Sequence, residues 1–81
     1  MVVKLGNVYI NLDAVPIVEF DVDDEGRERV IFWLHQGPVA YVKGEEVPEE
    51  EFNRFKDAME SFKDAMEILG KGAIYVNSWE A

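Results

Sequence analysis

The chain has 81 residues, enough for one small domain with no room for a second hydrophobic core. It carries 17 Asp and Glu against 8 Lys and Arg, which gives a net charge of -9 at pH 7. Cysteine is absent, which excludes disulfides, a thiol nucleophile and cysteine-based metal sites. The few cations are scattered, which disfavours direct binding to nucleic acid, and no apolar run reaches the roughly 20 residues of a membrane helix.

The first half of the chain has the alternating apolar pattern of β-strands. The turn signal Gly6-Asn7 separates two such segments, which predicts a hairpin at the start of the chain. The sheet should occupy about residues 2–43. The strand segments fall at 2–5, 8–12, 17–22, 30–35 and 39–43.

The second half of the chain predicts one long helix and a final strand. Pro48 stands before three glutamates, and proline and acidic residues are typical of a first helical turn. The helix should run from about Pro48 to Leu69, and a last strand should follow at about 73–79. Short connections between the strands favour a single α+β domain over residues 1–81. Its expected architecture is an antiparallel β-meander of five to six strands, curled or barrel-like, with the helix packed on one face.

The predicted helix contains a seven-residue repeat, FKDAME, and an apolar seam with spacings of three and four. Three interpretations remain open. The seam packs on the protein's own sheet, or it meets the same helix of a second subunit, or it forms a methionine-rich groove for a foreign helix. The seam consists of Phe52, Phe55, Met59, Phe62, Met66 and Leu69.

The segment Val30–Leu34 is apolar on both sides, so this strand should be covered on both faces of the sheet. One helix covers one face, and an exposed aromatic patch usually marks an interface. Either the sheet closes on itself or a second copy covers the other face, and we expect a homodimer. The candidate interface residues are Ile31, Trp33, Tyr41, Phe55, Met59, Phe62 and Met66.

Acidic residues gather in two segments, 19–28 and 45–51. The candidates for a functional acidic surface are Asp21, Asp23, Asp24 and Glu25. Acids at the first, third and fifth positions of this loop resemble the opening of a calcium loop, but the place of its last ligand holds an apolar residue, so no metal is expected. The acidic surface then binds a basic protein, imitates the phosphates of nucleic acid, or only keeps the protein soluble.

The sequence contains few residues of the types that act in catalysis. Threonine is absent, the serines are Ser61 and Ser78, and His35 is the single histidine. An enzyme would need His35 with a carboxylate, and a lone histidine on a strand is more often a packed residue. The sequence contains no nucleophile elbow or glycine-rich phosphate loop, so we expect no cofactor.

The segment Gly6–Val15, followed by two further strands, resembles small bacterial and phage proteins of unknown function. It is also distantly similar to the opening of small flagellar proteins linked to swarming motility. The shared features are a glycine turn, the strand Tyr9-Ile10-Asn11 and the strand that ends before Gly37, which together cover about half the chain. The resemblance implies β-meander structure and no particular activity or site.

These observations favour a small acidic, non-enzymatic protein that acts through protein–protein contacts and associates with itself. The first alternative is a phage-type acidic inhibitor or nucleic-acid mimic that binds a basic protein. The second alternative is a small enzyme that uses His35 and a carboxylate. The N-terminus lacks a basic segment followed by a long apolar one, so we expect no signal peptide and a cytoplasmic location.

Overall fold

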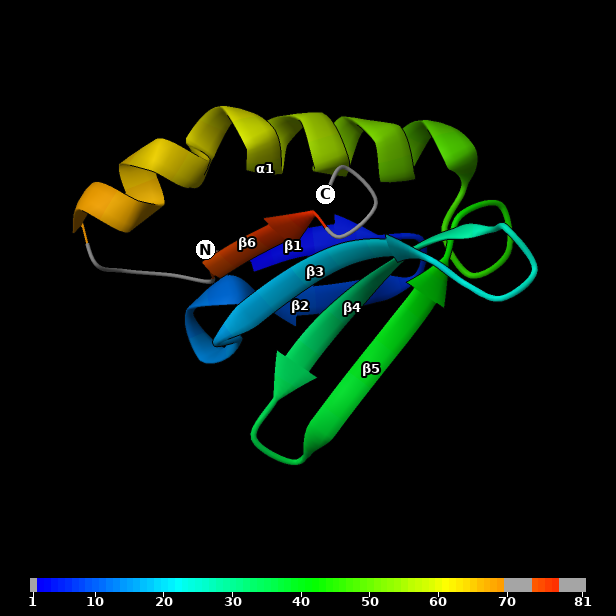
Figure 1. The fold of residues 1–81 in the computed structure, drawn as a ribbon, viewed down its shortest axis with the longest axis horizontal. Helices are drawn as coiled ribbons and strands as arrows, with labels where there is room; N and C mark the ends of the chain where they lie inside the picture. Colours follow the sequence, from blue (N-terminus) through cyan, green and yellow to red (C-terminus); the bar gives the residue numbers. More distant parts are fainter. Residues whose placement is uncertain (1, 70–73, 78–81) are drawn as a thin grey trace.

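The computed structural model describes the backbone of residues 2–69 and 74–77, and the side chains of residues 2–61. It confirms an α+β fold with one long helix (Figure 1). The elements are strands β1 (Val2–Leu5) and β2 (Val8–Asn11), the short 3-10 helix η1 (Leu12–Ala14), strands β3 (Ile17–Val22), β4 (Glu28–Leu34) and β5 (Gly37–Val42), the helix α1 (Glu49–Leu69) and strand β6 (Ile74–Asn77). The helix begins one residue later than expected, and the ends of the expected strand 73–79 lie outside the described residues.

The strands form two sheets, so the expectation of one continuous meander is wrong. Strands β1 and β2 pair only with each other, as an antiparallel hairpin. The second sheet has the order β5-β4-β3-β6, in which β3, β4 and β5 are antiparallel and β6 runs parallel to β3. The two sheets do not close into a barrel, which corrects the barrel-like expectation.

Local geometry explains both departures from the meander. After β2, the side chain of Asn11 accepts a hydrogen bond from the backbone N–H of Asp13 and starts the turn η1, and Pro16 follows before β3. This turn directs the chain away from the hairpin, so β3 does not pair with β2. At the other end, α1 carries the chain back along the sheet, so β6 runs in the same direction as β3.

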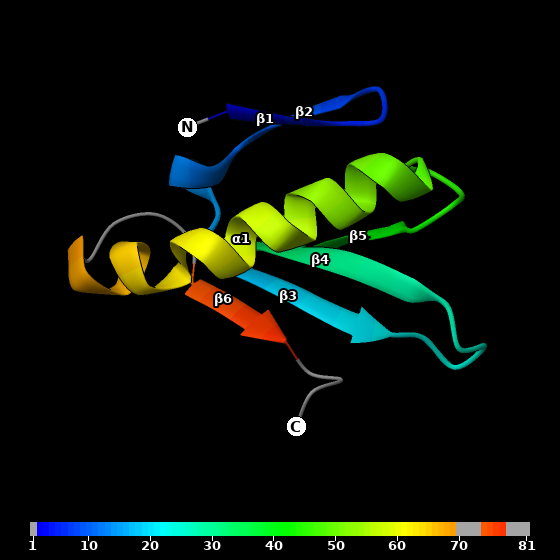
Figure 2. The same cartoon turned by 90° about the horizontal axis from the view of Figure 1, so that it is seen from above.

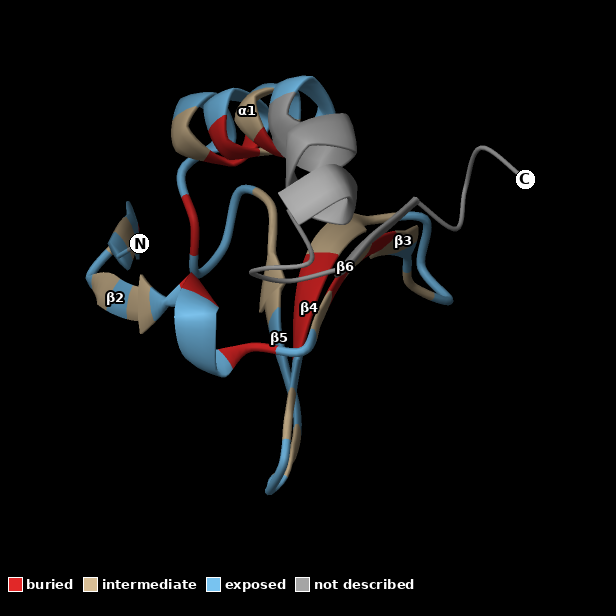
Figure 3. Cartoon of the chain, turned by 90° about the vertical axis from the view of Figure 1, so that its left-hand side faces the viewer, coloured by how far each residue is buried: buried red, intermediate tan, exposed pale blue. Residues whose placement is uncertain are grey.

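The core lies between three parts of the fold: α1, the hairpin with η1, and one face of the four-stranded sheet (Figure 3). Aromatic rings fill its centre. Phe20 meets Phe52 edge-on with ring centroids 5.7 Å apart, and Phe32 lies 6.0 Å from Phe55. The buried core residues are Leu5, Leu12, Val15, Val18, Phe20, Val30, Phe32, Val47, Phe52, Phe55 and Met59.

Figure 2 shows that α1 lies across the sheet, with the hairpin on one side of it and β6 on the other. The helix contacts both β1 and β6. The helix covers one face of the four-stranded sheet, and the hairpin lies beside the helix on the same side of the sheet. The sheet face that points away from α1 receives neither element.

The hairpin is attached to the start of α1 through its turn. Gly6 has a φ of 59°, and its backbone N–H donates to Oε2 of Glu51 at 2.6 Å. A Cβ atom at this position would lie 2.5 Å from the backbone oxygen of Glu46, closer than real contacts allow. Glycine is therefore required here both by the backbone conformation and by the close approach of the neighbouring loop.

Candidate interaction surfaces

The four acidic candidates lie where β3 ends and the turn to β4 begins. Asp21 faces Arg29 across the strands, and its two carboxylate oxygens accept from the guanidinium at 2.6 and 3.0 Å. Asp23 and Glu25 both pair with Arg27, although Glu25 is exposed, as is Asp24. The turn therefore holds Asp23, Asp24 and Glu25, Asp21 belongs to β3, and three of the four carboxylates have an arginine partner within the fold.

Asp23 holds the turn together. Its Oδ1 accepts the backbone N–H groups of Glu25 and Arg27, each at 2.9 Å, and its Oδ2 accepts Nε of Arg27 at 3.0 Å. The backbone hydrogen bond from Arg27 is the largest of the effects that lower the pKa of Asp23. The side-chain bond with Asp23 in turn raises the pKa of Arg27. A carboxylate with these donors is a structural cap for the turn.

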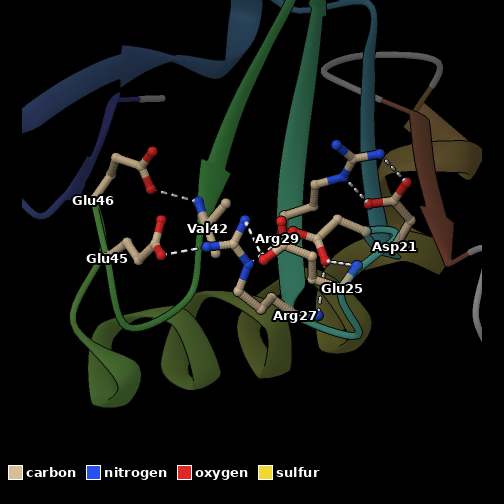
Figure 4. Close-up of polar contacts among 8 residues, drawn as sticks. Asp21, Glu25, Arg27, Arg29, Val42, Glu45 and Glu46 are labelled. Carbon is tan, nitrogen blue, oxygen red and sulfur yellow. Dashed lines mark hydrogen bonds and ion pairs between the residues drawn. The ribbon is translucent and has the colours of Figure 1, made fainter.

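Arg27 joins this turn to the loop between β5 and α1. Figure 4 shows its guanidinium reaching Glu45 of that loop, with Arg29 and Asp21 alongside as a separate pair. Lys43 makes a similar link to Glu28, with its Nζ 2.7 Å from Oε2. These ion pairs are half-exposed, so each contributes little to stability, but together they hold two loops in one arrangement.

A second candidate surface is the sheet face opposite α1, here called the outer face. Its central residues Ile31 and Trp33 alternate along β4 with the core residues Val30 and Phe32. The strand register places Ile17 and Glu19 of β3 on one side of them, and Pro38 and Ala40 of β5 on the other. Ile31 is only 6% exposed, whereas Trp33 is 39% exposed.

The indole of Trp33 does not point straight out of the outer face. Its Nε1–H donates to Oε1 of Glu19 at 2.9 Å, and Glu19 pairs in register with Ile31, two residues along β4 from Trp33. The ring therefore extends diagonally across the face. Ile31, the register partner of Glu19, is buried although neither α1 nor the hairpin lies on this face.

The remaining interface candidates lie elsewhere. Phe55 and Met59 are 7% and 4% exposed and belong to the core, so this part of the helix seam packs on the protein's own sheet. Tyr41 is on the inner side, where its ring meets Phe32 edge-on at 5.9 Å. Phe62 and Met66 have side chains outside the described residues. Of the five candidates whose side chains the structure describes, Ile31 and Trp33 lie together on the outer face.

A groove that the sequence did not predict lies between the hairpin and the sheet, here called the hairpin groove. It has a volume of about 250 Å³ and a largely apolar lining. Its wall is β2 with η1 and Val15, and its floor is formed by the inner sides of β4 and β5. Tyr9 on the wall is 71% exposed and Val39 on the floor is 38% exposed. The floor residues are Phe32, Leu34, Val39 and Tyr41.

The sequence contained only an indirect signal for this groove. Tyr9 and Val39 each occupy apolar positions in strands, but nothing in their spacing shows that two separate sheets face each other. The prediction of a single sheet removed the possibility of a groove between two sheets. The separation of the hairpin from the four-stranded sheet is therefore the step on which the groove depends.

The enzyme alternative depends on His35, which lies in the turn between β4 and β5 and is exposed. His35 and Asp13 line one open hollow of about 350 Å³. The hollow brings a histidine and a carboxylate together, and none of its described lining residues is a serine. Within the described part of the chain, no group of three or more His, Asp and Glu residues is arranged to hold a metal ion.

No known protein family matches this chain, and neither a curated protein nor a solved structure matches it. Among the residues that the structure describes, no helix is both long enough and apolar enough to span a membrane. The case for a function therefore rests on the surfaces described above.

Proposed function

We propose that this protein is a non-enzymatic interaction protein and that its first partner is a second copy of itself, bound through the outer face. The observation that supports this proposal is that β4 is apolar on both faces. Val30 and Phe32 point into the core, whereas Ile31 and Trp33 point the other way, where neither α1 nor the hairpin lies. A strand with this pattern usually belongs to a sheet that is covered on both sides.

The outer face is prepared for a contact that buries it. The bond to Glu19 restricts the indole of Trp33, and the Asp21 pair restricts the Arg29 side chain farther along β4. Side chains that are already ordered lose less entropy on binding. Tryptophan is also enriched among the residues that contribute most to binding. A second copy would present the same apolar centre, so the contact can be symmetric.

Charge gives this proposal a distinctive salt dependence. Each copy carries -9, so the two copies repel one another at low ionic strength. Added salt screens this repulsion, because the Debye length falls to about 8 Å at physiological ionic strength. Self-association should therefore tighten as salt rises. Binding to a basic protein would weaken under the same conditions.

The test is sedimentation equilibrium of the wild type, Trp33→Lys and the control Val22→Lys, at low and high salt. Val22 is 41% exposed and comes from the inner side of β3, away from the outer face. The wild type and Val22→Lys should dimerise with the same affinity, and Trp33→Lys should weaken the dimer about thirty-fold, as expected for a central tryptophan. Circular dichroism checks that each variant is folded.

Two results would overturn the proposal. The wild type could remain a monomer at millimolar concentration in high salt. Alternatively, a folded Trp33→Lys variant could dimerise as tightly as the wild type.

The geometry supports the acidic alternatives less well. Asp21 and Asp23 are engaged with Arg29 and Arg27, which leaves fewer unpaired charges to imitate phosphates. The alternative with His35 has a carboxylate nearby in Asp13, but the hollow that they line is open, and its described lining contains no serine. Measured activity that is lost in His35→Ala would favour the enzyme.

A further inference from the structure

The hairpin groove combines an apolar floor with the free edge of a strand. Four consecutive residues of β2, Val8–Asn11, line it. In a strand, alternate side chains point to opposite faces, so a run of four lining residues means that the edge of the strand borders the groove. A peptide in this groove would therefore meet both backbone hydrogen-bonding groups and apolar side chains.

The register of the hairpin shows which backbone groups are available. Leu5 and Val8 are partners on either side of the two-residue turn, and such a pair exchanges backbone hydrogen bonds. In an antiparallel pair of strands every second pair of partners does so, and the next such pair is Val3 and Ile10. The backbone N–H and C=O groups of Tyr9 therefore face away from β1, towards the groove. The N–H of Asn11 does the same, whereas its C=O accepts the first hydrogen bond of η1, in which Asn11 is the N-cap. Tyr9 and the N–H of Asn11 can therefore accept a third strand.

The edge of β5 is blocked by comparison. The backbone N–H of Lys43 donates to the carbonyl of Glu28, which shows that Lys43 and every second residue before it bond to β4. The backbone groups of the residues between them therefore point away from β4, towards the free edge of the sheet. These residues are Pro38, Ala40 and Val42. Pro38 has no N–H to offer, and the N–H of Val42 is bonded to Oε2 of Glu46 at 2.9 Å. Proline and charged side chains on an edge strand prevent pairing with other chains. The chain thus protects β5 but leaves β2 open.

Two carboxylates lie beside lining residues of the groove. Asp13 precedes Ala14 in the chain, and Glu46 accepts the backbone N–H of Val42, which follows Tyr41. None of the lining residues that the structure describes is charged. With a net charge of -9 on the whole chain, an extended apolar segment with cationic ends has complementary charge.

We propose that the hairpin groove binds an extended segment of a different protein, which adds to β2 as a third strand. Its alternate side chains are apolar and rest on Leu34, Val39 and Tyr41, and Lys or Arg flanks it at both ends. Val8–Asn11 spans about 13 Å at the usual rise per residue, so the bound segment is short. Main-chain hydrogen bonds to Tyr9 and Asn11 hold the segment, and the apolar floor selects it.

The proposed site is separate from the outer face, since the floor of the groove is the inner side of the sheet. A second copy is also a poor occupant of the groove. Both copies carry a net charge of -9, so they repel one another. The segment Val8–Asn11 of a second copy contains no Lys or Arg and is followed by Asp13, so it lacks the cationic ends that the groove favours.

The experiment uses fluorescently labelled peptides with the pattern KKXSXSXKK, where X is Val, Ile, Leu or Phe, titrated with the full chain and followed by anisotropy. Three control peptides accompany each one. Two of them replace either the central X or the serine that follows it with proline, so that one of the pair removes a backbone donor that faces β2, and the third replaces the lysines with glutamates. At least one apolar peptide should bind with micromolar affinity, and the glutamate peptide and at least one proline peptide should bind about tenfold or more weakly.

Protein variants locate the site. Val39→Glu places a charge on the groove floor, and Val22→Glu is the matched control, a similarly exposed valine of the same sheet. Val39→Glu should weaken peptide binding at least tenfold, and Val22→Glu should leave it unchanged. The same titrations with Trp33→Lys show whether the outer face takes part.

The proposal is overturned if no peptide of the set binds, if both proline peptides bind as well as their parent, or if folded Val39→Glu binds like the wild type. It is also overturned if Val39→Glu converts a dimer to a monomer, because the occupant would then be a second copy. A monomeric wild type that still binds the peptides would refute the proposed dimer and leave this inference standing.

Discussion

Replacing Gly6 with alanine should destabilise the protein far more than a glycine-to-alanine change in an ordinary turn. The added Cβ would lie 2.5 Å from the backbone oxygen of Glu46, and the φ of 59° is one that alanine adopts with strain. Relief of the clash requires the hairpin turn to move away from the loop. That movement separates the Gly6 N–H from the carboxylate of Glu51, now 2.6 Å away.

The size of the effect follows from these two terms. The left-handed backbone conformation costs alanine about 1 kcal/mol. Loss of a hydrogen bond to a charged, half-buried carboxylate costs about 2 kcal/mol. Gly6→Ala should therefore lower the free energy of unfolding by about 3 kcal/mol. In a domain of this size the melting temperature would fall by more than about 10 °C.

Gly26→Ala is the matched control. Gly26 also has a positive φ, 81°, but a Cβ atom there would have no neighbour within 4 Å. Gly26→Ala should therefore lower the free energy of unfolding by only about 1 kcal/mol, which is the cost of the left-handed backbone conformation. Urea unfolding followed by circular dichroism, at one fixed protein concentration, measures both variants and avoids shifts caused by self-association.

A double-mutant cycle with Glu51→Gln tests the mechanism. If Gly6→Ala already separates the turn from Glu51, the second change should add little in the Gly6→Ala background. Equal losses for Gly6→Ala and Gly26→Ala would refute the close approach of the loop to the hairpin. Additive effects of Gly6→Ala and Glu51→Gln would refute the shared contact.

Two further predictions concern the core and the acidic turn. Phe52→Ala, which removes a ring with 0% exposure from the aromatic cluster, should cost about 3–5 kcal/mol in urea unfolding, whereas a loss below about 1 kcal/mol would mean that the helix does not pack as described. Asp23→Asn should destabilise the protein at neutral pH, because the folded state lowers the pKa of Asp23 and the ionised carboxylate stabilises the turn above its unfolded pKa of about 4. This difference between wild type and variant should vanish as the pH falls through the folded pKa, and a difference that persists unchanged in acid would contradict the assignment.

The candidate sites were predictable to different degrees. The pairing of Asp21 with Arg29 follows once the turn between β3 and β4 is placed, because the two residues are partners in the hairpin register. The double-sided apolar pattern of β4 also indicates an outer face around Trp33. The hairpin groove was not predictable, because it depends on two sheets that face each other. The contact between Gly6 and Glu51 joins residues 45 positions apart, and no local pattern contains it.

The sequence by itself determined the local elements of this protein. The proline and glutamates before α1, the seven-residue repeat and the alternating strands each act over a few neighbouring residues, and the helix bounds agree with the expectation to within one residue. Only the tertiary structure decided how these elements meet. The turn η1 separated the hairpin from the sheet, and the path of α1 placed β6 parallel to β3. Such choices depend on the packing of a shared core, because each strand pattern is compatible with several partners and only the burial of the whole set selects one.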